Sequence, residues 1–443
     1  MDEKIFKAYD IRGIYPDELN EEAAYNIGRA FVSFLGKDSP EIVVGMDNRL
    51  SSESLAAFLE KGIIEQGGKV IKIGLCSSPM FYFAVAKYNY DGGIMVTASH
   101  NPKNYNGFKL VGQAGIPISS DNGLQQIKEL VKAGNFKSPV VMGGKKEINI
   151  LQDYVATLQN PNEFNYIIVV DTGNAVSGVP VPQILSKTGL IHIFDELDGN
   201  FPNHEPNPQI KENLRDLQSA IRIAGANLGV AFDGDGDRIF FLDEESQIIP
   251  ADLILALVSA IILRKKGKQK IVYDLRCSNI VPETIKSWGG APIMTKVGHS
   301  FIKQKMREEE AFFGGEVSGH YYTKEAFYSE NPFFVIFTIL SEMQKTKKSL
   351  SALIEPFQKY FHSDEINFTV TDPLQKIKVI KEKYENQRKA KLLEIDGLRI
   401  DFEDWWFLVR ASNTEPILRL IVEAPTHFLM EEKIKEISEI INA

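Results

Sequence analysis

The 443-residue sequence is poor in cysteine and has no excess of basic residues. Cys76 and Cys277 are its only two thiols and lack metal-ligand spacing, so they fit a reducing compartment better than a disulfide framework. With 50 Lys and Arg against 59 Asp and Glu, the net charge is −9, which leaves no basic footprint for nucleic acid. We therefore expect a cytoplasmic protein without a nucleic-acid partner.

Long hydrophobic runs are also missing. The longest, residues 253–263, contains one serine and is about half the ~20 residues that a membrane span requires, so it predicts a buried helix. The charged start, residues 1–10, has no apolar core of signal-peptide length. These features predict a protein that neither spans a membrane nor is secreted.

A strand that ends in aspartate and is followed by a candidate helix occurs three times, at residues 42–47, 167–171 and 271–274. These copies lie about a hundred residues apart, which indicates an α/β fold built from three related α/β domains with mixed sheets. After Ser363 the pattern favours a smaller C-terminal α+β domain, with a lysine-rich helix over residues 376–391 and a strand over residues 405–409. The predicted boundaries are 1–149, 150–250, 251–364 and 365–443.

The segment from Asp233 to Asp237 predicts a metal site. Asp233, Asp235 and Asp237 alternate with glycines between two short apolar runs, 228–232 and 239–242. Carboxylates this close repel one another unless a cation neutralises them, and carboxylate oxygens suit a hard divalent ion. We expect Mg²⁺ at this loop.

A second loop, residues 97–102, follows a candidate strand and displays a serine. Ser99 could accept a phosphoryl group, with His100 to orient it and Lys109 to shuttle protons or neutralise charge. Serine and asparagine are also common turn formers, so the spacing alone leaves an ordinary turn open.

Three further segments contain cationic or polar groups in turns. Residues 410–416, with Arg419 in the next strand, could hold a phosphate, since guanidinium groups match phosphate oxygens. Residues 314–320 could bind sugar hydroxyls, and residues 296–300 form a cationic turn. Each of these segments could equally be an ordinary satisfied loop.

Taken in order, these segments resemble the α-D-phosphohexomutase superfamily, in its phosphomannomutase/phosphoglucomutase branch. The resemblance covers nearly the whole chain, although Lys7 and the segment 329–332 depart from the family pattern. It is carried by residues 9–13, 45–52, 97–102, 105–109, 233–238, 296–300, 315–320 and 410–416.

This resemblance implies four domains around a central cleft, with Ser99 carrying the phosphoryl group. Mg²⁺ would be held by Ser99, Asp233, Asp235 and Asp237, while Arg12, His100 and Lys109 assist proton transfer and charge balance. The residues implied to bind substrate are Tyr9, Arg238, Lys296, His299, Glu316, Ser318, His320, Arg410, Ser412, Asn413, Thr414 and Arg419.

The activity implied is a phosphohexomutase that interconverts hexose 1-phosphate and hexose 6-phosphate. A hexose 1,6-bisphosphate would be its intermediate and activator, sugar phosphates its partners, and the chain a monomer or homodimer. The alternatives are a phosphoglucosamine or phosphopentose mutase, a non-catalytic phosphosugar-binding protein on the same fold, and a metal-dependent phosphatase. The phosphatase would not need the second phosphate site at residues 410–416.

Overall fold

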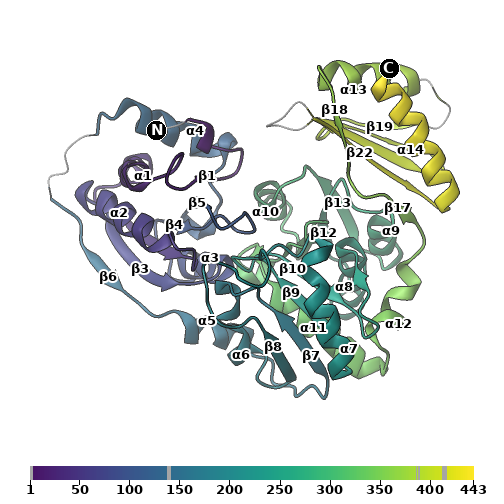
Figure 1. Ribbon diagram of the computed structural model, residues 1–443, viewed down its shortest axis with the longest axis horizontal. Coiled ribbons are helices and arrows are strands. Elements are labelled where there is room, and N and C mark those ends of the chain that lie inside the picture. Colours follow the sequence, from purple (N-terminus) through teal and green to yellow (C-terminus); the bar gives the residue numbers. More distant parts are fainter. Residues whose placement is uncertain (1–2, 137–140, 386, 388–389, 412–416) are drawn as a thin grey trace.

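The computed structural model describes residues 3–136, 141–385, 387, 390–411 and 417–443. The chain forms three α/β domains followed by a C-terminal domain, which lies beside the third domain in Figure 1. This arrangement confirms the predicted fold class.

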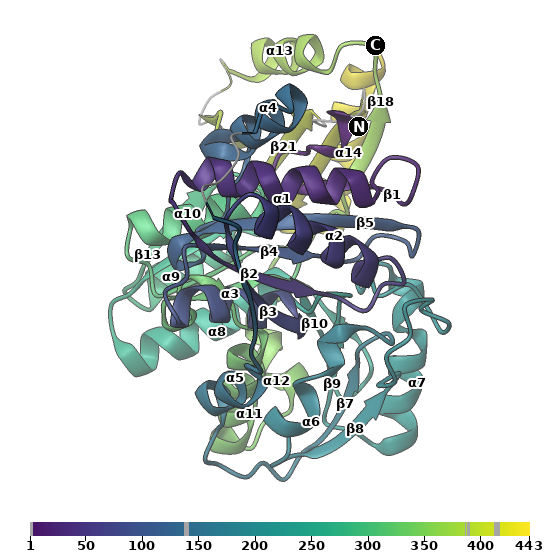
Figure 2. The ribbon, with the colours of Figure 1, turned by 90° about the vertical axis from the view of Figure 1, so that its left-hand side faces the viewer.

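The first domain is built on a six-stranded mixed sheet with helices on both faces (Figure 2). In the central strand, Ile42 and Val44 pack with Leu59 of one helix layer, whereas Val43 packs with Phe81 of the other. The strand order is β1 (Ile11–Ile14), β5 (Tyr105–Gly112), β4 (Gly92–Val96), β2 (Glu41–Met46), β3 (Lys69–Leu75) and β6 (Lys145–Glu147). The helices are α1 (Glu21–Leu35), α2 (Ser52–Glu65), α3 (Ser78–Lys87) and α4 (Gln125–Ala133).

The second domain contains a five-stranded sheet. Its strands β9 (Leu228–Phe232) and β10 (Ile239–Leu242) have the limits that the sequence predicted, and they pair in antiparallel register. The other strands are β7 (Ile167–Asp171), β8 (Gly189–Ile193) and β11 (Ile248–Ile249), and the helices are α5 (Leu151–Leu158), α6 (Val181–Ile184) and α7 (Arg215–Ala224).

The third domain also has a five-stranded mixed sheet. Its helix α8 (Ala251–Lys266) is the buried helix predicted over residues 253–263. Within the described parts of the chain, no helix combines the length and the hydropathy needed to cross a bilayer. The strands are β12 (Lys270–Asp274), β13 (Ala291–Thr295), β14 (Phe313–Gly315), β15 (Tyr321–Thr323) and β16 (Ser329–Glu330), and the remaining helices are α9 (Ile280–Ser287), α10 (His299–Glu308), α11 (Pro332–Thr346) and α12 (Leu350–Ile354).

The C-terminal domain is an antiparallel sheet with two helices. The lysine-rich helix expected over residues 376–391 is α13 (Pro373–Tyr384), so both predicted limits were wrong, and residue 391 begins a strand instead. The strand expected at 405–409 is β21 (Trp406–Ala411). Pro373 at the first helical position explains the earlier start of the helix. The other elements are β17 (Phe361–His362), β18 (Ile366–Thr369), β19 (Lys391–Leu393), β20 (Leu398–Asp401), β22 (Ile417–Ala424) and α14 (His427–Asn442).

One continuous hydrophobic cluster joins the first three domains. It includes Phe81 of α3, Val230 of β9 and Leu255 of α8. Because helix α3 is buried among residues of the other two domains, the loops beside its N-terminus are held in fixed positions. A different contact fixes the C-terminal domain, where fully buried Arg399 donates to Leu275 O at 2.6 Å and to Asn279 Oδ1 at 2.7 Å.

Candidate active site

The three aspartates of the predicted metal loop lie in the turn between β9 and β10 and are buried. One oxygen of each carboxylate lies within 4.8 Å of the others. Gly234 allows this turn to approach the first domain, because a Cβ there would lie 2.4 Å from Ser99 O. The turn therefore brings three carboxylates against the serine loop of another domain.

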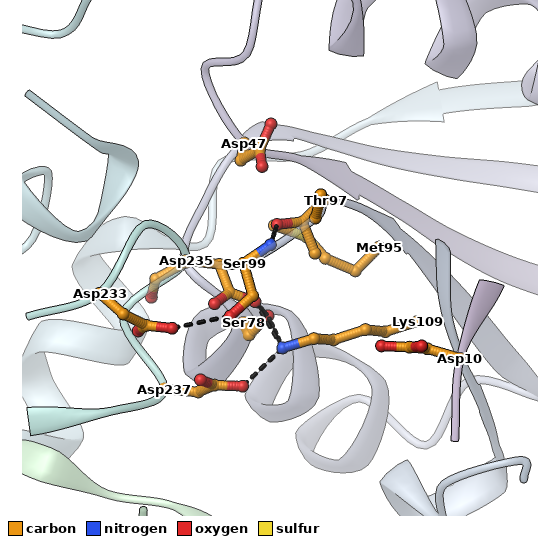
Figure 3. A network of polar contacts seen from close by, with 12 residues as sticks. Asp10, Asp47, Ser78, Met95, Thr97, Ser99, Lys109, Asp233, Asp235 and Asp237 are labelled. Atoms are coloured by element: carbon orange, nitrogen blue, oxygen red, sulfur yellow. Dashed lines mark hydrogen bonds and ion pairs between the residues drawn. The ribbon is translucent and has the colours of Figure 1, made fainter. Parts of the chain in front are cut away.

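Ser99 faces these carboxylates from the loop that follows β4 (Figure 3). Its Oγ donates to Asp233 Oδ2 at 2.7 Å and lies 3.1 Å from His100 Nδ1. Its φ of 52° is left-handed, a strained conformation for a serine. The Ser99 amide donates to Thr97 Oγ1 at 2.9 Å, which helps to hold this conformation.

The acidic loop fits a divalent cation. Burial, then repulsion from Asp237 and Asp235, raises the pKa of the Asp233 carboxyl well above its ordinary range. Asp235 Oδ1 is buried and has no hydrogen-bond partner among the described residues. Lys109 pairs with both Asp235 and Asp237, but one ammonium does not neutralise three carboxylates. The oxygen-only donor set and its excess charge match what Mg²⁺ requires.

The pKa values of two residues predicted to assist the reaction, Lys109 and His100, shift in opposite directions. Burial alone would lower the pKa of Lys109, but attraction to Asp235 and Asp237 outweighs it and raises the pKa well above its usual value. Burial, with repulsion from Arg238 and Arg12, lowers the pKa of His100 well below its usual value. Lys109 therefore stays protonated and is suited to charge balance, whereas His100 stays neutral and is suited to orient Ser99 through a hydrogen bond.

Residues 314–320, predicted to bind sugar hydroxyls and called the sugar loop below, lie directly beside the metal loop. His320 Nε2 is 3.2 Å from Asp237 Oδ1, and His320 Nδ1 is 3.0 Å from Glu316 Oε1 and 2.9 Å from Ser318 Oγ. A backbone bridge between Arg238 and His320 pins the two loops together. Thus Glu316, Ser318, His320 and Arg238 converge with the aspartates.

The cationic turn at residues 296–300 packs against the N-terminal segment. Tyr9 OH donates to Val297 O at 3.1 Å, and the Tyr9 ring makes an edge contact with His299. The rings of His299 and His320 stack with centroids 6.2 Å apart. Lys296 is exposed and lies over the Phe301 ring.

Arg12 connects the N-terminal segment to the serine loop. It donates to Asp10 Oδ2 at 2.7 Å and forms a hydrogen bond to the Asn101 side chain.

The remaining predicted residues belong to the C-terminal domain. Arg410 and Arg419 are direct neighbours across β21 and β22, and both pair with Glu365, at 3.3 Å and 2.9 Å. The Nε atoms of both arginines are buried without a hydrogen-bond partner among the described residues. Arg410 Nη1 also lies 3.7 Å from Asp396 Oδ2, so the two buried Nε–H groups, rather than an excess of positive charge, are what this pair offers to an anion. Ser412, Asn413 and Thr414 lie outside the described residues.

Arg276 was missed by the sequence reasoning. It follows β12, and its guanidinium pairs with Asp274 at 2.9 Å and with Glu316 at 3.3 Å. The strand-then-aspartate pattern at 271–274 was noticed, but nothing in the sequence indicated that the next cation would reach the sugar loop.

Arg49 was missed as well, although it lies in one of the segments that carry the resemblance. It is buried and pairs with Asp47 at 3.2 Å. Its guanidinium also donates to three carbonyl oxygens of the serine loop, Ser99 O at 2.7 Å, Asn101 O at 2.6 Å and Pro102 O at 2.7 Å, and to Tyr105 O at the start of β5 at 3.1 Å. Arg49 therefore holds the backbone of the loop that displays Ser99.

We expect Arg49→Lys to lower kcat by about 30-fold with a smaller change in KM, because an ammonium cannot reach all four carbonyls and Ser99 loses its alignment. Steady-state kinetics of the activity that the sequence resemblance implies measure this. Arg29→Lys on α1, which changes an arginine that packs over Phe136, is the matched control and should leave kcat unchanged. Equal losses in both variants would contradict the positioning role.

Four sequence families match the chain in order, and together they span nearly all of it. They are described as phosphoglucomutase/phosphomannomutase alpha/beta/alpha domain I (residues 3–138), domain II (150–246), domain III (250–360) and C-terminal domain (365–440).

Relatives match over the full length. A phosphomannomutase of Methanocaldococcus jannaschii is 40% identical over 99% of this chain and 97% of its own. A phosphomannomutase/phosphoglucomutase of Pseudomonas syringae pv. tomato is 38% identical over 97% and 93%. A solved structure of a phosphoglucomutase/phosphomannomutase family protein from Burkholderia thailandensis is 31% identical and covers 99% of this chain and 97% of its own, with a TM-score of 0.92.

The order of the four domains, with a serine facing an acidic loop where three of them meet, defines an α-D-phosphohexomutase. Enzymes of this class are isomerases that move a phosphoryl group within their substrate. The chain belongs to the phosphoglucomutase/phosphomannomutase family. This confirms the resemblance drawn from the sequence motifs.

Proposed function

We propose that the protein interconverts hexose 1-phosphates and hexose 6-phosphates of mannose and glucose through a phosphorylated Ser99. The observation that carries this proposal is the contact between Ser99 Oγ and Asp233 at 2.7 Å, within the cluster of three buried carboxylates. The names of the full-length relatives support the two sugars.

In the first half-reaction the free sugar hydroxyl attacks the phosphorus on Ser99, the bond between phosphorus and Ser99 Oγ breaks, and the proton of the sugar hydroxyl ends on Ser99 Oγ. In the second, Ser99 Oγ attacks the other phosphate of the bisphosphosugar, the bond from that phosphorus to the sugar oxygen breaks, and the serine proton ends on the sugar oxygen that leaves, which restores a hydroxyl. His100 Nδ1, 3.1 Å from Ser99 Oγ, orients the serine. Mg²⁺, held by Ser99, Asp233, Asp235 and Asp237, would neutralise charge on the transferred group. Lys109 and Arg12 balance the remaining charge around the serine loop.

Between the two halves the bisphosphosugar must exchange its two ends. The sugar loop, with Glu316 and Ser318, therefore has to accept hydroxyls in both orientations, and His320, His299, Lys296, Tyr9 and Arg238 line the same region. Arg410 and Arg419 hold the phosphate that is not reacting, together with Ser412, Asn413 and Thr414 of the adjoining segment. A hexose 1,6-bisphosphate serves as both intermediate and activator.

We also propose the domain limits 1–149, 150–250, 251–364 and 365–443, which lie close to the matched family ranges. The chain would act as a monomer or homodimer, since every proposed site residue comes from the same chain.

The test is ³¹P NMR of the purified protein with Mg²⁺ and a trace of bisphosphosugar, offered mannose 1-phosphate and glucose 1-phosphate separately. Appearance of the 6-phosphate signal supports the mutase and ranks the two sugars. Inorganic phosphate alone would instead support a phosphatase. Absence of turnover with both sugars would favour a phosphoglucosamine or phosphopentose substrate, or a binding protein.

We expect Arg410→Ala to raise the KM for sugar phosphate about 100-fold, because a bidentate guanidinium contact to phosphate is lost. The rate at which phosphorylated Ser99 is slowly hydrolysed should not change, since this hydrolysis needs only water and the metal loop. Coupled assays of mutase turnover and of phosphate release measure the two activities. Arg222→Ala on the surface of α7 is the control, and a comparable loss there would contradict the phosphate site.

A further inference from the structure

Lys303 of α10 and Glu330 of β16 form a buried ion pair that the proposed reaction does not use. Their Nζ and Oε2 atoms are 2.7 Å apart, and both side chains are 0% exposed. Glu330 lies in the segment 329–332, which departs from the family pattern. Beyond the ion pair itself, these charged atoms have no hydrogen-bond partner among the described residues.

Such a pair is a poor device for stability. Taking two charges out of water is costly, and replacing an unsupported buried pair with apolar residues is often neutral or stabilising. Other contacts also stabilise the Lys303 ammonium: its Nζ lies 3.7 Å from the centre of the Tyr82 ring and 5.9 Å from that of Tyr322, and Asp237 attracts its charge. The location of the pair, rather than its contribution to folding stability, therefore indicates its role.

The pair lies between the sugar loop and the metal loop. Glu330 stands directly opposite Tyr322 in the β15–β16 ladder, and the Tyr322 hydroxyl donates to Glu316 Oε1 at 2.6 Å. A carboxylate oxygen of Glu330 also lies within 4.8 Å of ligand atoms of Asp237 and His320. A unit charge at this distance, out of water, acts strongly on whatever binds at Asp237.

We propose that Lys303 and Glu330 are a charge-balanced pair of positioning residues that sets the divalent-cation affinity of the loop at residues 233–237. Glu330 adds negative potential beside Asp237 and so strengthens cation binding. Lys303 offsets that charge and keeps the Glu330 carboxylate in place. The inference rests on the proposed function insofar as that function assigns the cation to this loop.

A second metal ion on Asp237, His320 and Glu330 is the competing interpretation, since these three groups also have ligand spacing. Lys303 argues against it, because its ammonium already lies against the Glu330 carboxylate. The two interpretations differ in the number of cations bound per chain.

The experiment is Mn²⁺ binding to the substrate-free full chain, followed by electron paramagnetic resonance at pH 6.5, where an ammonium retains its proton unless its pKa falls by about four units. We expect Glu330→Gln to weaken binding about tenfold, since it leaves an uncompensated cation near Asp237. Lys303→Met should bind as tightly as the parent or more tightly. The double variant K303M/E330Q should return to within about threefold of the parent.

Unchanged binding in Glu330→Gln, or equal weakening in both single variants, would overturn the proposal, as would loss of a second bound Mn²⁺. If Glu330→Gln fails to fold, Lys303→Met should bind Mn²⁺ more tightly than K303M/E330Q, and equal binding would overturn the proposal. If Lys303→Met fails instead, Glu330→Gln should bind more weakly than K303M/E330Q, in which the charge-free pair should be tolerated. Asp235→Asn is the separate control for the loop itself. If it leaves Mn²⁺ binding intact, the metal site of the proposed function fails, independently of the pair.

Discussion

Replacing Ser99 by Ala should lower mutase turnover by about 1,000-fold or more and abolish transfer of ³²P from labelled bisphosphosugar to the protein. The reason is that Ser99 supplies the only proposed oxygen that receives the phosphoryl group, and the left-handed serine backbone at φ 52° aims it at the metal loop. Turnover by the NMR assay and label on the denatured protein measure the two effects.

The matched control is Ser33→Ala in α1, where the hydroxyl only donates to Arg29 O at 3.0 Å within its own helix. It should keep both turnover and labelling. If Ser99→Ala still became labelled on a residue of the same chain, a different side chain would carry the phosphoryl group. Sugar phosphate should still bind to Ser99→Ala, because the arginines of the C-terminal domain are unchanged.

The second large effect is expected at the metal loop. Asp235→Asn should weaken Mg²⁺ binding and lower kcat, each by about 100-fold, since it removes one of three carboxylate charges that converge on the cation. The change also weakens the ion pair of Lys109 with the loop. Calorimetric titration and kinetics at increasing Mg²⁺ separate lost affinity from lost rate. Asp243→Asn, in the turn after β10, is the control because it removes a buried carboxylate of the same domain outside the site.

The pH dependence of cation binding follows from the same cluster. In the metal-free protein the pKa of Asp233 is raised, first by burial and then by Asp237 and Asp235, so this carboxyl holds a proton that a cation must displace. Affinity for Mg²⁺ should therefore rise with pH until Asp233 is ionised.

The stability of the metal-free fold should change with pH in the opposite direction. Because the carboxyl pKa of Asp233 is higher in the folded than in the unfolded state, the metal-free protein becomes less stable as pH rises above the unfolded-state pKa. Thermal unfolding with and without Mg²⁺ tests both, and stability that rises with pH in the metal-free protein would contradict the assignment.

Local sequence patterns predicted the elements that carry the site. Alternating aspartate and glycine at residues 233–237 separate the apolar runs 228–232 and 239–242, a pattern that predicts a tight turn between two strands, and β9 and β10 have those limits. The buried helix α8 followed from an apolar run too short for a membrane. Elements at the periphery were less well placed: α13 begins three residues before the predicted helix because Pro373 favours the first helical turn.

Contacts between distant segments could not be read from spacing. Arg49 and the serine loop are separated by about fifty residues, and their hydrogen bonds depend on how β2 and β4 pair in the sheet. The ion pair of Lys303 with Glu330 depends in the same way on α10 packing against the β15–β16 hairpin.

The sequence by itself determined the four-domain α/β organisation, the acidic turn at residues 233–237, the displayed Ser99 and the family. These properties are local, because periodicity, glycine positions and adjacent charges act within a few residues. Only the tertiary structure decided which loops meet, that Lys109 pairs with two aspartates while His100 stays neutral, and that Arg410 and Arg419 share Glu365. Those outcomes depend on burial and on charges brought together from separate domains, which no single segment of the chain contains.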